Sequence, residues 1–119
     1  MVSKEAINSA INNHSIWKRR LIEAIDSGKS EFQVSTVEKD NVCEFGKWLS
    51  GLTAMAKGSE DFKKVNELHS QFHIAAASVL DLALRSKKEA AKDQLNFNGS
   101  FGEISSKLTV ALSNWKKKL

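Results

Sequence analysis

The chain contains no proline in its 119 residues, and this absence constrains its fold more than any other feature. Proline interrupts a helix because it lacks a backbone N–H and its ring clashes with the preceding turn. Only six glycines are present, so long helices are easy to build, whereas strands joined by tight turns are not indicated. We therefore expect an all-α protein, and residues 1–119 suffice for a single domain with a buried core.

Apolar residues recur at intervals of three and four in four segments, as they do on one face of a helix. These segments run from about Ser3 to Ile25, from near Asp40 through Leu52, from about Glu60 to Leu95, and from about Phe101 to Lys116. We expect Asp40 to cap the second helix and residues 29–38 to form an extended connection or an irregular loop. Four amphipathic helices bury their apolar faces most simply as a four-helix bundle.

The three histidines and the single cysteine all fall on predicted inward faces. His14 continues the apolar face of the first segment, and His69 and His73 lie one turn apart on that of the third. Cys43 lies beside Phe45 and Trp48 in the second. A buried imidazole costs free energy unless both ring nitrogens are bonded, and a metal ion would take one nitrogen of each ring. A metal site at these four residues is therefore predicted.

Three imidazoles and one thiolate are ligands that suit a tetrahedral Zn²⁺ ion. Copper(II) would bind the same donors more tightly, but free copper is scarce in cells. A di-iron site, as in a hemerythrin-like oxygen carrier, needs several inward carboxylates, and Glu67 lies off the face that His69 and His73 share. Each residue alone also fits ordinary packing, as a hydrogen-bonded core histidine or a filler cysteine. The zinc hypothesis depends on the four together.

Short motifs surround these positions: HSIW at residues 14–17, CEFGKW at residues 43–48 and HSQFH at residues 69–73. In this order and at about this separation, they resemble the bacterial chemoreceptor zinc-binding domain, often called the CZB domain, over roughly residues 10–110. The resemblance implies that His14, Cys43, His69 and His73 are the zinc ligands. It also implies a symmetric homodimer.

A zinc ion with four protein ligands has no open position for water or substrate, so we expect no enzymatic activity. The resemblance implies a sensory or regulatory module that responds to zinc, or to oxidants through Cys43. Its output would be a chemoreceptor or a diguanylate cyclase, reached as a separate partner or as a fused domain. The alternative is a purely structural zinc bundle that serves as a dimerisation module.

The net charge of +4 arises largely from Lys116, Lys117 and Lys118 at the end of the chain. No basic stripe is interleaved with aromatic residues, so we expect no nucleic-acid partner. The N-terminal residues lack the apolar run of a signal peptide, and no segment approaches the roughly 20 apolar residues of a membrane span. With a lone cysteine that cannot form an internal disulfide, we expect a cytoplasmic protein without a membrane partner.

Overall fold

The computed structural model describes residues 4–39, 43–52, 54–96 and 98–119. Over these ranges the chain is helical with no strand, which confirms the all-α prediction. The helices are α1 (Lys4–Ser27), α2 (Val34–Val37), α3 (Glu44–Ser50), α4 (Ala54–Lys57), α5 (Glu60–Leu84), α6 (Lys88–Leu95) and α7 (Ser100–Lys117).

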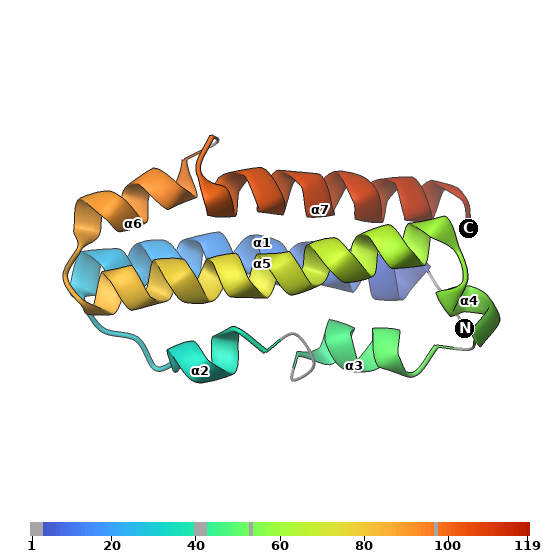
Figure 1. Cartoon of the computed structure of the whole chain (residues 1–119), viewed down its shortest axis with the longest axis horizontal. Helices are drawn as coiled ribbons and strands as arrows, with labels where there is room; N and C mark the ends of the chain where they lie inside the picture. The colour runs from blue at the N-terminus through green and yellow to red at the C-terminus, as the bar shows by residue number, and fades with distance from the viewer. Residues whose placement is uncertain (1–3, 40–42, 53, 97) are drawn as a thin grey trace.

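The helices lie lengthwise in a bundle of 45 × 25 × 19 Å (Figure 1). α1 and α5 run in the same direction. Two interrupted rods, one formed by α2 and α3 and the other by α6 and α7, run in the opposite direction. α5 is the central element, because it packs against α1, α2, α6 and α7. The four rods agree with the predicted four-helix bundle, but α2 and α6, which were not predicted as separate helices, form parts of two of them.

The predicted continuous helix from Glu60 to Leu95 is wrong, since α5 ends at Leu84 and α6 begins at Lys88. Ser86 lies between them with φ of 62°, a left-handed conformation that ends a right-handed helix. All residues from 84 to 90 are exposed, so no apolar face continues through the break. The chain turns there, and α6 packs back against α5.

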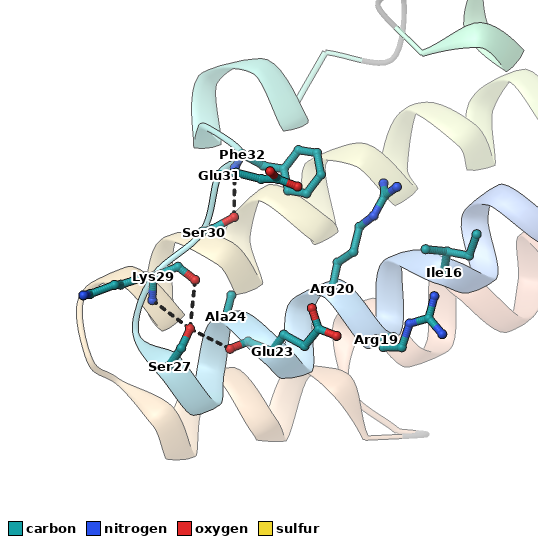
Figure 2. Close-up of a pocket in the computed structure, with 10 residues that line it drawn as sticks. All are labelled: Ile16, Arg19, Arg20, Glu23, Ala24, Ser27, Lys29, Ser30, Glu31 and Phe32. Atoms are coloured by element: carbon teal, nitrogen blue, oxygen red, sulfur yellow. Dashed lines mark hydrogen bonds between the residues drawn. The ribbon is translucent and has the colours of Figure 1, made fainter.

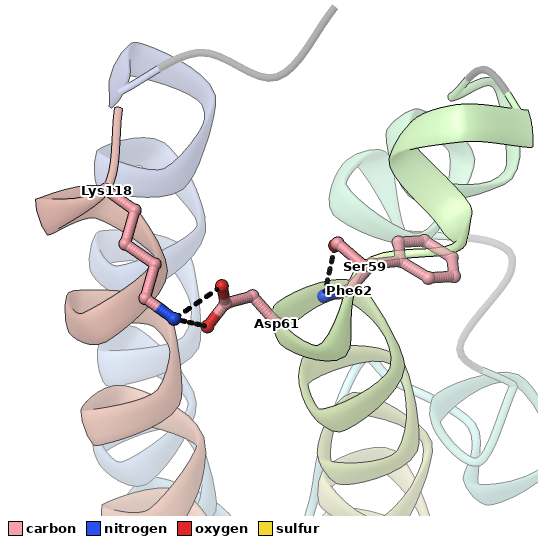
Figure 3. A network of polar contacts seen from close by, with 4 residues as sticks. All are labelled: Ser59, Asp61, Phe62 and Lys118. Carbon is pink, nitrogen blue, oxygen red and sulfur yellow. Dashed lines mark hydrogen bonds and ion pairs between the residues drawn. The ribbon is translucent and has the colours of Figure 1, made fainter.

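The apolar core lies where α1, α5 and α7 meet. Its largest fully buried side chains include Ile7, Leu21, Phe72, Leu80, Phe101, Leu108 and Leu112. At the end of the bundle, Ser59 caps α5 by accepting a hydrogen bond from the Phe62 N–H at 3.1 Å. The carboxylate of Asp61 pairs with Lys118 at 2.9 Å and so ties α5 to the end of α7 (Figure 3). Within the described ranges, no helix is both long and apolar enough to cross a membrane.

The backbones of α6 and α7 approach each other closely at Gly102. A Cβ atom added there would collide with the carbonyl oxygen of Asn96, and the Asn96 carbonyl carbon would be only 2.8 Å away. We expect Gly102→Ala to lower the free energy of unfolding by about 1–3 kcal/mol in denaturant titrations, because backbone atoms must shift. Gly58→Ala is the control, since its Cβ would meet nothing nearer than 3.5 Å. Equal stability of the two variants would contradict the close approach.

Candidate metal centre

The structure brings all four predicted ligand residues together between α1, α3 and α5. His14 comes from α1, His69 and His73 from successive turns of α5, and Cys43 from the residue before α3. Each offers a donor atom, and these atoms all lie within 4.8 Å of one another. The three histidines are buried, whereas Cys43 is half-buried.

The spacing of the donor atoms is close to that of a tetrahedral site. His69 Nε2 lies 3.0 Å from His73 Nε2 and 3.3 Å from Cys43 Sγ. Zinc bonds of about 2.0 Å to nitrogen and 2.3 Å to sulfur would place tetrahedral ligands about 3.3 Å apart for two nitrogens and about 3.5 Å for nitrogen and sulfur. Small movements of the side chains therefore suffice to enclose an ion.

A backbone carbonyl determines which ring nitrogen of His73 carries the proton. Its Nδ1 lies 2.9 Å from the carbonyl oxygen of Val37. A carbonyl can only accept, so Nδ1 donates, and in the neutral ring the lone pair is then on Nε2, which faces His69. This is the usual outer contact of a metal-binding histidine. The sequence alone did not predict this contact, because the acceptor is a main-chain carbonyl in the segment predicted to be a connection or loop.

The segment that supplies this carbonyl contains the short helix α2, at Val34–Val37. α2 packs directly against α5, and Val37 is buried. The prediction of an extended connection or an irregular loop is therefore wrong for these four residues, which are helical. Tertiary packing against α5 decides their conformation.

Cys43 is itself the N-cap of α3, and its sulfur accepts a hydrogen bond from the Gly46 N–H at 3.3 Å. The prediction that Asp40 caps this helix is wrong, because the helix begins at Glu44; Asp40 lies outside the described residues. The position of Cys43 at the helix cap affects the charge state of its sulfur. A hydrogen bond to sulfur favours the thiolate, which is the form that binds metals.

Burial keeps two of the histidines neutral. Burial, together with the nearby rings of His14 and His73, lowers the pKa of His69 to about 3. Burial and then the His73 ring lower the pKa of His14 to about 4, which the Ala10 carbonyl one turn earlier opposes in part. At neutral pH both rings therefore carry a lone pair, as metal binding requires.

Aromatic rings enclose His14. Phe72 lies edge-on to its ring, with centroids 4.8 Å apart, and Phe45 does so at 5.7 Å. Trp48 stacks on Phe45 and contacts Trp115. Trp17 packs its ring on Phe32 at 5.0 Å.

These residues fit a zinc ion. His14 Nδ1 is buried without a well-formed hydrogen bond in the described part of the chain, and His69 Nε2 faces both a thiol and a second imidazole nitrogen. Such a cluster is costly to bury without an ion, because polar atoms are left unsatisfied. Three imidazoles and one sulfur match the donors and the coordination number that zinc prefers.

Comparison with known families agrees with this geometry. The sequence pattern of the chemoreceptor zinc-binding domain matches residues 14–80, a span that begins at His14 and includes the other three candidate ligands. The chain belongs to this family. The resemblance drawn from the three motifs is thereby confirmed. The chain shows no significant match to an individual curated protein or to a solved structure.

The low histidine pKa values predict that this CZB domain loses stability in acid when it holds no metal. His14 and His69 have folded-state pKa values below the 6.5 of the unfolded chain, so below pH 6.5 the unfolded state binds more protons. Stability present above pH 6.5 is lost as the pH falls toward the folded values, by up to about 1.4 kcal/mol per pH unit for each ring. Urea unfolding of chelator-treated protein from pH 7 to 5 measures this slope. His14→Phe should reduce it, and an unchanged slope would contradict the assignment.

Proposed function

We propose that this chain is a zinc-binding sensory or regulatory module, with His14, Cys43, His69 and His73 as the ligands. The observation that carries the proposal is the convergence of one thiol and three imidazoles from three separate helical elements. Family membership supports zinc as the ion. Elemental analysis of purified protein tests it: about one zinc per chain is expected, and its absence would contradict the proposal.

Zinc would be bound by side chains alone, so we assign it a regulatory role and no catalytic one. The chain's contribution is to hold three neutral imidazoles and a thiolate, and to fix the His73 ring through Val37. When bound, the ion supplies a cross-link between α1, the start of α3 and α5. Occupancy then alters how firmly α3 is held, because the backbone of α3 lies farther from the other helices than that of α2 does.

The signal would pass to a partner, as the family's association with chemoreceptors suggests. We propose a homodimer that acts on a chemoreceptor or a diguanylate cyclase, either in trans or within one polypeptide. A thiolate ligand requires reducing conditions, which supports a cytoplasmic setting. A purely structural zinc bundle is the second candidate, favoured by the complete set of four protein donors. Half-exposure of Cys43 favours exchange and so the sensory role.

A zinc-release experiment separates these two roles. We expect one equivalent of hypochlorite to release zinc from the wild type, because oxidation of Cys43 removes a donor. Cys43→Ala should bind zinc more weakly through its three histidines and release no more of it with oxidant than without. A chromogenic chelator follows the release.

Met55→Leu is the control for this experiment. The Met55 side chain is 90% exposed and carries the one sulfur atom besides that of Cys43 in the described part of the chain, so its replacement should leave release unchanged. Equal release by oxidant from Cys43→Ala and the wild type would eliminate the thiol switch and leave the structural role.

A further inference from the structure

A pocket of about 280 Å³ opens beside the candidate metal centre. Cys43 and His73 form part of its wall, and α1 and the segment around α2 form the rest. The residues that matter to its chemistry are Trp17, Arg20, Phe32, Lys39, Cys43 and His73. Because Cys43 is half-buried, the pocket offers a solvent molecule or a small solute a way to its sulfur.

Arg20 is held in this pocket by aromatic rings. Its guanidinium carbon lies 5.0 Å from the centre of the Trp17 ring and 4.9 Å from that of Phe32. Figure 2 shows the side chain extended toward Phe32, whereas that of Arg19 lies apart from it. Within the described residues, Arg20 has no ion pair with a carboxylate. A planar cation positioned by two rings, with its charge unpaired, is well suited to attract an anion.

Among the described residues that line the pocket, positive charges outnumber negative ones. Lys39 adds a second cation. Glu44 opposes them, but its carboxylate is 88% exposed and pairs with Lys47 at 3.6 Å, so water and that lysine screen it. The larger groove of about 720 Å³ in Figure 2 shares Arg20 and Phe32. That groove also holds Glu23 and Glu31 beside Arg19 and Lys29, and no cysteine is among its lining residues, so a reactive anion would find no thiol there.

We propose that the smaller pocket admits small anionic electrophiles to Cys43 and that Arg20 selects them by charge. This selection would serve the oxidant response proposed above, and it rests on that proposed function. With an oxyanion oxidant, the thiolate sulfur forms one bond to oxygen while the bond between that oxygen and its carrier breaks. The sulfur is oxidised by two electrons, which leave with the carrier as an anion, so no further reagent is needed. Neutral electrophiles of the same size gain nothing from Arg20.

Two alkylating reagents of nearly equal size test this selection, namely iodoacetate, which is anionic, and iodoacetamide, which is neutral. Both attach a carbon to the Cys43 sulfur and release iodide. Rates are measured by mass spectrometry on the full chain after chelator treatment. We expect Arg20→Gln to slow iodoacetate roughly three- to tenfold, as the loss of one nearby charge implies, and to leave iodoacetamide within about twofold. Arg20→Lys should restore much of the iodoacetate rate.

Arg19→Gln is the matched control, because it removes the same charge from the adjacent residue, which does not line the smaller pocket. It should leave the ratio of the two rates unchanged. If both variants slow iodoacetate equally, net charge alone acts and the proposal fails. If Arg20→Gln slows both reagents equally, Arg20 only shapes the pocket, and the proposal fails again. If the wild type held no zinc, the proposed function would be overturned, but the alkylation rates could still be measured. Failure of the proposed function can therefore be distinguished from failure of the charge selection by Arg20.

Discussion

We expect His69→Gln to abolish stoichiometric zinc binding and to raise the zinc dissociation constant at least about 100-fold, since loss of an outer contact alone costs 10- to 100-fold. His69 is the central donor of the cluster, with its Nε2 within 3.3 Å of both Cys43 Sγ and His73 Nε2. Glutamine preserves polarity and approximate size but supplies no imidazole nitrogen. Competition with a chromogenic chelator measures the affinity, and elemental analysis measures the zinc retained through purification.

Gln71→Ala is the matched control for this variant. Gln71 lies two residues further along α5 on its exposed face, where its side-chain amide donates a hydrogen bond to Glu67 at 3.4 Å. Its replacement changes the same helix without touching the site, so zinc content should match the wild type. Zinc content near the wild-type value in His69→Gln would remove His69 from the ligand set, and the donor set would then have to be reassigned.

His69 and His73 illustrate which features of the site are readable from sequence. A four-residue spacing on an apolar helical face places both side chains inward and one above the other. In the structure both side chains are buried. The same periodicity located α1 and α7 to within a few residues. That His14 and Cys43 meet them requires a tertiary arrangement, which periodicity does not specify. The cost of burying three imidazoles without an ion suggested that step, and the linked motifs of the CZB family supported it.

Other features depended on backbone groups and on packing, which sequence patterns do not encode. The Val37 carbonyl orients His73, yet any residue type has a carbonyl. Cys43 acts as a helix cap, although serine, threonine, aspartate and asparagine are the residues that usually do so. The break at Ser86 lacks proline or glycine and shows only as a polar run. The placement of Arg20 against Trp17 and Phe32 likewise emerges only from the fold.

Removal of zinc from the wild type should lower its thermal unfolding midpoint by about 15 °C. The four donors come from three elements, and the unfolded chain has no preformed site, so the free energy of binding adds to that of folding. Free zinc at 1,000 times its dissociation constant contributes about 4.1 kcal/mol. For a chain of this length, each kcal/mol moves the midpoint by roughly 4 °C. Calorimetry of chelator-treated and reconstituted protein measures the difference.

Removal of zinc should destabilise some helices more than others. This unevenness distinguishes a sensor from a bundle that zinc stabilises as a whole. α7 packs extensively on α5 and supplies no donor, so its amides should keep nearly the same hydrogen-exchange protection without zinc. α3 depends on Cys43 at its first turn and packs less closely on the other helices. Its amides should therefore lose protection first. His69→Gln with added zinc is the control and should show neither the rise in midpoint nor the protection of α3. Equal loss of protection in α3 and α7 would mean that zinc supports the whole bundle, and the structural role would then explain the site better than the sensory one.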